Sequence, residues 1–149
     1  MRLVIQRVQS ASVEIEGAVT AKIGSGMLIL IGIEQIDTKE DALWLSKKIS
    51  SLRIFPDADD KMNIDIHQSG GSVLVVSQFT LHANTKKGNR PSYIRAAAPE
   101  HAIPLYDYFI EQLRANGLQV ETGMFGAMMQ VKLVNDGPVT IFMDSKSKE

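Results

Sequence analysis

One apolar stretch near the N-terminus limits what this chain can fold into more than any other. It reads Gly26-Met27-Leu28-Ile29-Leu30-Ile31-Gly32-Ile33, a continuous apolar run bounded by glycines. Such a run is typical of a central β-strand, which is covered on both faces by other parts of the protein. The fold must therefore place structure on both sides of this strand.

Two helices are predicted from apolar stripes and end signals. The first spans about residues 38–51 and is capped by Asp37 or Thr38, with an acidic residue three positions later. Its stripe consists of Ala42, Leu45, Ile49 and Leu52. The second begins at Pro99 and ends at Asn116-Gly117, and Pro104 is expected to kink it or delay its start. Its apolar face consists of Leu105, Tyr106, Phe109, Ile110 and Leu113.

Predicted strands outnumber the helices. Leu3-Val4-Ile5 and Val13-Glu14-Ile15 are expected to form an antiparallel pair, and a β-branched run after Gly70-Gly71 leads into the polar cluster 77–81. Further strands are expected at residues 118–121, 128–135 and 139–144. No repeat or linker divides the 149 residues. We therefore expect a single α+β domain, residues 1–149, with the helices on one face and a frayed tail at 145–149.

The chain contains no cysteine, which removes disulfides, thiolate nucleophiles and thiolate metal sites at once. This composition fits a reducing compartment. The first residues return to charge at Arg7 after a short apolar stretch, so neither a signal peptide nor a membrane span is predicted there. We expect a cytoplasmic protein.

The formal net charge of −1 argues against general binding of nucleic acid, which needs a strongly basic surface. A local basic segment is nevertheless present between Ser77 and Ala98, which holds Tyr93 and no acidic residue. Its basic residues are Lys86, Lys87, Arg90 and Arg95. Basic side chains beside an aromatic one on a loop suit RNA, and a solvated loop has the same composition. Both interpretations stay open.

No motif for a metal or a cofactor is present. The three histidines, His67, His82 and His101, lack zinc-ligand spacing, and the carboxylates at 57–60 lack the later glycine and glutamate of a calcium loop. Gly24-Ser25-Gly26 precedes a strand and not a helix, unlike a phosphate loop. We therefore expect neither a metal nor a cofactor.

A serine-type esterase is one alternative. Ser77 or Thr80 could act as a nucleophile with His82 as its base, although no Gly-x-Ser-x-Gly motif surrounds either hydroxyl. A trapped acyl group on Ser77 would identify such an enzyme.

A second unusual feature lies near the C-terminus, where Asp136-Gly137-Pro138-Val139 separates two apolar runs. Asp-Gly normally marks a two-residue hairpin turn, yet the next residue is a proline, which cannot donate to a strand ladder. A Gly-Pro bond can also be cis, which is uncommon. A rigid turn is the simplest interpretation of the pair taken alone.

Both motifs together resemble the D-aminoacyl-tRNA deacylase, or D-tyrosyl-tRNA deacylase, family. The resemblance is carried by Ser77-Gln78-Phe79-Thr80-Leu81 and Asn135-Asp136-Gly137-Pro138-Val139-Thr140, with Met1–Val8 and Met124–Met129. It runs from end to end and shows no departure at the motif positions. It implies a largely antiparallel mixed sheet curled into a partial barrel with two long helices, a homodimer, and a likeness to an editing module of archaeal threonyl-tRNA synthetases.

The resemblance also implies where the chemistry occurs. The ester and the terminal adenosine of the tRNA would lie on residues 77–80. Catalytic positions would be Gln78, Phe79 and Thr80, through backbone N–H groups and one hydroxyl. Substrate-binding positions would be Ser77, Phe125, Met128, Gly137 and Pro138. The implied attacking group is water or the neighbouring ribose hydroxyl.

Gly137 and Pro138 would reach into the partner subunit's site and exclude L-amino acids with rigid backbone atoms, while Arg7 fastens their loop. D-aminoacyl-tRNA, and glycine mischarged onto alanine tRNA, would be hydrolysed. The third alternative is a non-catalytic RNA-binding or dimerisation module that uses the basic loop.

Overall fold

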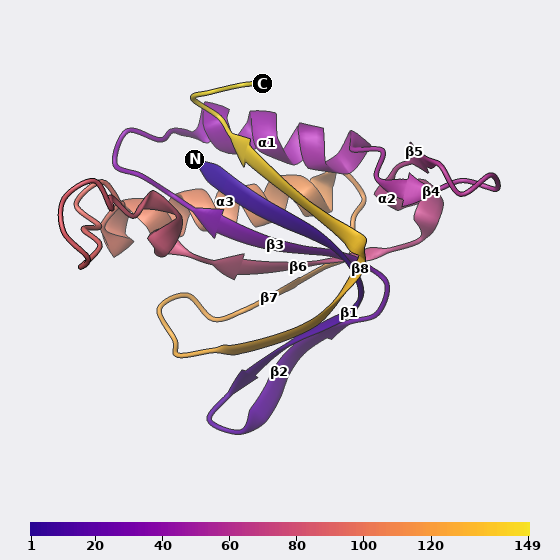
Figure 1. Ribbon diagram of the computed structural model, residues 1–149, viewed down its shortest axis with the longest axis horizontal. Helices are drawn as coiled ribbons and strands as arrows, with labels where there is room; N and C mark the ends of the chain where they lie inside the picture. Colours follow the sequence, from indigo (N-terminus) through magenta and orange to yellow (C-terminus); the bar gives the residue numbers. More distant parts are fainter.

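The computed structural model describes residues 1–149, and a helical layer covers one face of a curled mixed sheet (Figure 1). The sheet has the order β2-β1-β3-β6-β7, and β8 pairs with β1. The strands are β1 (Arg2–Ile15), β2 (Ala18–Ile23), β3 (Gly26–Gly32), β6 (Ser72–Ser77), β7 (Val120–Thr122) and β8 (Gln130–Asp144). The predicted α+β class is confirmed.

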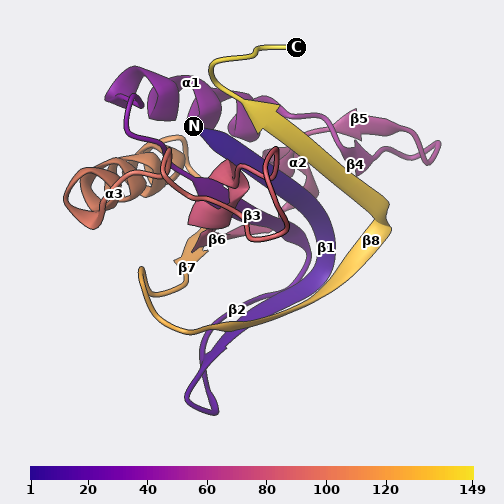
Figure 2. The same ribbon diagram turned by 60° about the vertical axis from the view of Figure 1, so that its left-hand side comes forward.

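The sheet curls until its ends approach each other. Strand β1 pairs antiparallel with β2, β3 and β8, whereas β3 with β6 and β6 with β7 are parallel pairs. Strand β2 also contacts β6 and β7 across the curl of the sheet. Figure 2 shows β1 and β8 bending side by side along this curl. The expected partial barrel, with mainly antiparallel neighbours, is therefore present.

Strand β3 is central and covered on both faces, as its composition predicts. Met27, Ile29 and Ile31 point to the helices and belong to the larger core cluster. Leu28 joins a second cluster inside the curl, with residues of β1, β2 and β6. Because successive side chains of a strand alternate between faces, one apolar run supplies both cores.

The two long helices are α1 (Lys39–Ser51) and α3 (Pro99–Ala115), which pack against each other over one face of the sheet. Thr38 and Asp41 form the capping box predicted for α1. Helix α3 begins at Pro99, so the late start expected from Pro104 is wrong. Pro104 lies near the N-terminus of the helix, where its missing N–H removes only one hydrogen bond. Short elements are α2 (Ile66–Ser69), the 3-10 helix η1 (Phe79–His82), β4 (Phe55–Pro56) and β5 (Met62–Ile64).

Strand β1 corrects the first predicted pair. Residues 3–5 and 13–15 lie on the same strand and do not pair with each other. The segment between them contains no glycine, proline, asparagine or aspartate, and serine is its only turn-favouring residue type. The two apolar segments instead serve different cores, because the strand bends between them.

Strand β8 corrects the prediction of two separate strands near the C-terminus. The expected strands 128–135 and 139–144 form one element that runs antiparallel to β1 along both halves. Residues 136–139 are looped out where the register shifts between the pairs Gln6–Thr140 and Val8–Asn135. The chain does not reverse there. Pro138 is tolerated because a bulge needs no ladder hydrogen bond.

The tail was expected to be frayed, and this is wrong for its first residues. Ser145 is buried and accepts a hydrogen bond from the Met1 ammonium (2.9 Å). The Lys146 ammonium contacts the Asp41 carboxylate at 2.9 Å. The tail lies beside the start of β1 because β8 pairs with that strand to its end.

Candidate active site

A cavity of about 340 Å³ lies where strands β3 and β6 end. Its walls are mainly apolar and include residues of β3, β6, β8 and α3. Five of the predicted site residues line it: Ser77, Gln78, Phe79, Phe125 and Met128. The fold thus brings the 77–80 motif and the 124–129 segment to one place, although they are far apart in sequence.

The backbone at the end of β6 is fixed by β3. The Gln78 N–H donates to the Ile31 carbonyl at 2.7 Å, and the chain then turns into η1. Gly32 makes this close approach possible. An added Cβ on Gly32 would lie 2.9 Å from the Gln78 carbonyl oxygen and 2.9 Å from the Leu81 Cβ.

Two backbone N–H groups at the start of η1 are free. The first N–H groups of a helix have no partner within it, and neither Phe79 nor Thr80 donates its N–H to any other group. Two free, adjacent donors beside a cavity are a suitable arrangement for stabilising an oxyanion.

The Thr80 hydroxyl is oriented by its neighbour. The Gln78 side-chain amide donates to Thr80 Oγ1 at 2.5 Å. A hydroxyl that accepts one hydrogen bond keeps its own proton for donation. Thr80 can therefore donate to a substrate oxygen or hold an attacking hydroxyl in place.

Two aromatic rings border the cavity. Phe79 is 55% exposed and packs edge-on against Tyr93, with ring centroids 5.0 Å apart. Phe125 packs edge-on against Tyr106 at 5.7 Å. The Tyr106 hydroxyl donates to the Val75 carbonyl at 3.1 Å, and burial raises the pKa of Tyr106 to about 12. Phe125 thus rests on a ring that is itself fixed. Met128 is 92% exposed and lies at the rim.

His82 does not activate a hydroxyl. Its side chain is buried, and neither ring nitrogen has a hydrogen-bond partner. Burial lowers the pKa of His82. Neither Ser77 nor Thr80 is hydrogen-bonded to it, so the nucleophile and base of a serine-type esterase are not assembled.

Gly137 and Pro138 lie outside this cavity and are exposed. The bulge that carries them directly follows Asn135, which pairs with Val8 of β1. The neighbouring β1 residue, Arg7, pairs on its other side with Met27 of β3, so the bulge lies near the Met27 end of β3. The cavity is at the Ile31 end, about 13 Å further along the strand. Figure 1 shows the bend of β8 at the opposite end of the sheet from the tip of β6. The peptide bond between the two residues is cis.

The bulge is held from both sides. Arg7 donates from Nε to the Asp136 carbonyl (3.2 Å) and contacts its carboxylate (3.1 Å), while Nη1 donates to the Ile54 carbonyl at 2.7 Å. The Asn135 side-chain amide donates to the Arg7 and Val139 carbonyls. The suggested fastening role of Arg7 agrees with these contacts.

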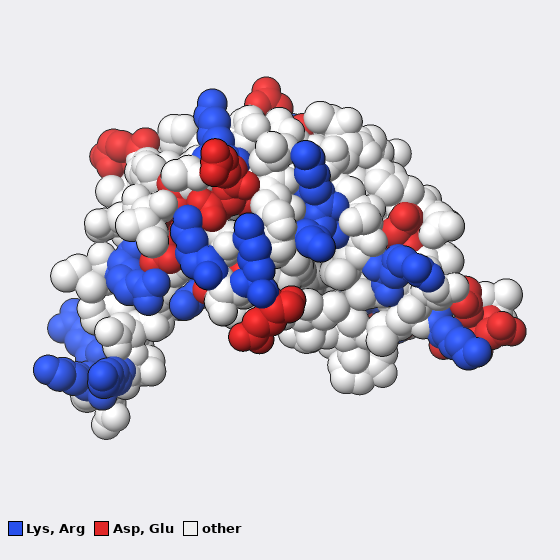
Figure 3. Space-filling model, turned by 90° about the horizontal axis from the view of Figure 1, so that it is seen from above, with Lys and Arg blue, Asp and Glu red and all other residues white.

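The basic loop projects beside η1. Lys86, Lys87 and Arg90 are exposed, and Figure 3 shows basic side chains gathered at the end of the molecule where this loop extends. Arg95 is engaged differently, because its guanidinium donates twice to the buried Glu34 carboxylate, at 2.7 and 3.1 Å. Arg95 therefore ties the loop to the end of β3.

Sequence reasoning missed two residues that shape the cavity. The sequence identifies Gly32 only as the end of an apolar run and Tyr106 only as part of a helix stripe. A glycine directly before the last residue of a buried run is a signal of close backbone approach. No sequence signal reveals the contact between Tyr106 and Phe125, because it depends on how α3 crosses the sheet.

The model of the D-Tyr-tRNA(Tyr) deacylase family matches residues 4–144. The chain belongs to this family. It is 62% identical to a D-aminoacyl-tRNA deacylase of Akkermansia muciniphila and 61% identical to one of Bacteroides thetaiotaomicron, in both cases over all of each chain. The resemblance inferred from the two motifs is confirmed, and the deacylase family consists of hydrolases that cleave the aminoacyl ester bond.

Two solved structures share the fold of this chain. The chain is similar to a c-Myc DNA unwinding element binding protein, with 40% identity and a TM-score of 0.90 over 97% of this chain and 98% of that one. A probable eukaryotic D-amino acid tRNA deacylase has a TM-score of 0.83 at 16% identity, over 95% and 97%, which shows the shared fold. No helix of this deacylase-family chain is long and apolar enough to cross a membrane.

Proposed function

We propose that this protein hydrolyses the ester bond of D-aminoacyl-tRNA at the cavity beside η1 and thereby removes D-amino acids from tRNA in the cytoplasm. The observation that carries the proposal is the pair of free N–H groups on Phe79, which lines the cavity, and on Thr80, which follows it in the chain and does not line the cavity. Family membership supports the reaction, and the cavity supports its location.

The terminal adenosine enters the apolar cavity, where Phe79 and Phe125 offer rings for stacking and Ser77 shapes the wall. The ester carbonyl oxygen then faces the free N–H groups, and one such donor lowers the barrier by about 2.7–4 kcal/mol. Thr80 positions the attacking group, which is water or the neighbouring ribose hydroxyl. When water attacks, it forms a new bond to the acyl carbon, the bond from that carbon to the ribose oxygen breaks, and this oxygen takes up the proton that the water gives up. When the ribose hydroxyl attacks first, the acyl group moves to that oxygen, and water then cleaves the new ester to release the amino acid.

Rejection of L-amino acids requires an obstacle, because both enantiomers carry the same groups. We assign this role to Gly137 and Pro138 of a second copy of the chain. Each copy carries the pair far from its own cavity, on an exposed bulge fixed by Arg7, so a homodimer is needed to complete the site. Backbone atoms cannot change rotamer, so the selection does not depend on the type of D side chain. Glycine on alanine tRNA has no side chain to exclude and is accepted.

The test compares D-tyrosyl-tRNA with L-tyrosyl-tRNA as substrates. The D ester is expected to be cleaved and the L ester to survive, whereas equal rates would refute the gate. Ser77→Ala is expected to keep substantial activity. Complete loss with an intact fold, or an acyl group trapped on Ser77, would establish the serine-type esterase. A tRNA without the ribose hydroxyl separates the two attacking groups.

A further experiment addresses the assembly. Sedimentation of the active protein is expected to give a dimer, and a fully active monomer would refute the shared site. Lys86, Lys87, Arg90 and Arg95 are assigned to RNA contact, with Arg95 also anchoring the loop. Tight tRNA binding without ester cleavage would favour the non-catalytic RNA-binding module.

A further inference from the structure

A second hollow, of about 390 Å³, lies at the end of η1 opposite Phe79. It differs from the apolar cavity because all but one of its lining residues are polar. These polar residues are Arg2, His82, Asn84, Thr85, Lys86 and Arg95. The hollow therefore has cationic and hydrogen-bonding groups but little apolar surface, which suits an anion better than a base or an apolar side chain.

His82 gives the hollow an unused hydrogen-bonding group. His82 lines the hollow, but its side chain is fully buried, and neither ring nitrogen has a hydrogen-bond partner. Buried polar groups nearly always have a partner, so the unpaired nitrogens of His82 mark a position where a water molecule or a bound ligand supplies one. The nearest carboxylate is that of Glu34, with Oε2 4.0 Å from Nδ1.

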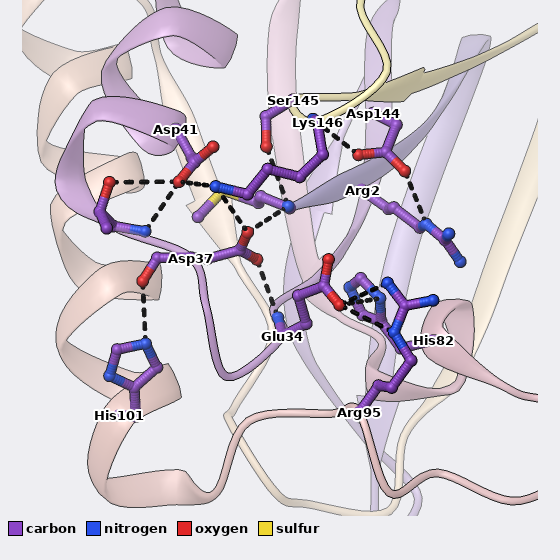
Figure 4. A network of polar contacts seen from close by, with 12 residues as sticks. Arg2, Glu34, Asp37, Asp41, His82, Arg95, His101, Asp144, Ser145 and Lys146 are labelled. Carbon is purple, nitrogen blue, oxygen red and sulfur yellow. Dashed lines mark hydrogen bonds and ion pairs between the residues drawn. The ribbon is translucent and has the colours of Figure 1, made fainter.

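The two arginines are held in place and still have donors to offer. Arg2 uses Nε for Asp144 and Nη1 for the Leu81 carbonyl, and Arg95 uses Nε and Nη2 for Glu34. The third nitrogen of each guanidinium makes no hydrogen bond. Figure 4 shows both guanidiniums on the same side of the Glu34 carboxylate as the His82 ring.

Lys86 gives the hollow its net positive charge. The two carboxylates that pair with Arg2 and Arg95 offset their charges, whereas Lys86 has no ion pair. One net positive charge therefore remains in the hollow, on an exposed side chain that can close over a bound anion. An organised set of donors around one surplus charge matches a singly charged phosphodiester.

The hollow and the apolar cavity are separated by one short helix. Phe79 lines the cavity and His82 lines the hollow, three residues further along η1, or about 6 Å along its axis. A nucleoside in the cavity therefore has its 5′ oxygen within reach of the hollow. We propose that the hollow binds the phosphate that joins the terminal adenosine to the preceding nucleotide of the tRNA. This inference rests on the proposed function, because it assumes that the adenosine occupies the cavity.

The test uses adenosine and adenosine 5′-monophosphate as competitive inhibitors of D-tyrosyl-tRNA hydrolysis. They share the nucleoside and differ by the phosphate that the hollow should bind. The monophosphate is expected to inhibit about fivefold more strongly in the wild type, since a charged contact of this kind contributes a modest factor. Equal inhibition constants for the two compounds would overturn the proposal.

Three variants locate the effect. Lys86→Ala and Thr85→Val should bring the two inhibition constants together without changing that of adenosine, and Lys61→Ala, a remote exposed lysine, should keep the wild-type ratio. Lys86→Ala should also lower the dependence of log kcat/KM on log salt by about one unit for the tRNA substrate. An unchanged ratio in Lys86→Ala and Thr85→Val would place phosphate recognition elsewhere.

A phosphate-free substrate separates this inference from the proposed function. D-tyrosyl-adenosine should be hydrolysed equally by the wild type and Thr85→Val, while the tRNA substrate shows a raised KM in the variant. If neither substrate is cleaved by the wild type, the proposed function fails. If both are cleaved and the variant treats them alike, only the phosphate site fails.

Discussion

Gly32→Ala tests whether the backbone of η1 is part of the catalytic machinery. Gly32 has an ordinary backbone conformation, so an alanine there is limited by space and not by strain. The new Cβ would lie 2.9 Å from the Gln78 carbonyl oxygen and 2.9 Å from the Leu81 Cβ, against at least 3.4 Å for ordinary contact. The start of η1 must therefore move by about half an ångström, and the N–H groups of Phe79 and Thr80 move with it.

Two magnitudes follow from this displacement. Overpacking of a buried site costs about 1–3 kcal/mol, which lowers the melting temperature by roughly 2–12 °C in a protein of this size. A misplacement of about 1 Å costs a rate factor of about 100, so half of it should reduce kcat by at least about tenfold. The reduction should appear in kcat more than in KM, because the oxyanion forms only in the transition state.

The assay is steady-state hydrolysis of D-tyrosyl-tRNA, combined with a thermal melt of each variant. Gly24→Ala is the matched control, because its added Cβ meets no atom within 4 Å. It should retain the wild-type kcat and melting temperature. A folded Gly32→Ala protein with the wild-type kcat would show that the N–H groups of η1 do not stabilise the oxyanion.

Three other variants probe neighbouring parts. Arg7→Lys cannot reproduce the paired contacts with Asp136, so the loosened bulge should raise the relative rate on L-tyrosyl-tRNA by about tenfold, measured as the ratio of kcat/KM for the two esters. Tyr106→Phe should cost about 1 kcal/mol in urea unfolding, with activity changed less than twofold, because its ring packing is retained. Burial lowers the pKa of His82, so the unfolded chain takes up its proton first and stability falls as pH drops below about 6.5. Melts at about pH 7.5 and about pH 5.5 should show a smaller decrease for His82→Phe than for the wild type.

The elements with strong local signals were predictable from the sequence. The glycine-bounded run of β3 and the capping box of α1 depend on residues close together in the chain. The site motif at 77–80 was predictable by resemblance, and its cavity follows from the position of β6 in the sheet.

The predictions that were wrong concern two strands, β1 and β8, that continue where a break was expected, and the C-terminal tail, whose first residues are bonded to the rest of the protein. Apolar segments at 3–5 and 13–15, and the two halves of β8, have the pattern of separate strands. Each pair of segments forms one continuous strand because β1 and β8 pair along both of their halves. This pairing joins residues more than a hundred positions apart, so no local pattern indicates it. The same pairing brings Ser145 to the Met1 ammonium, which no local pattern indicates.

The continuous course of β8 also constrains how this part of the sequence can change over evolution or by design. Both flanks of the 136–139 bulge are paired with β1, so neither end of the loop is free to absorb a length change. A one-residue change that passed from the loop into the paired flank would turn every following side chain of the strand to the opposite face. Ile141 and Met143, which pack on the core, would then exchange places with the exposed Thr140 and Phe142. The loop can therefore change only in ways that keep both paired flanks of β8 in register with β1.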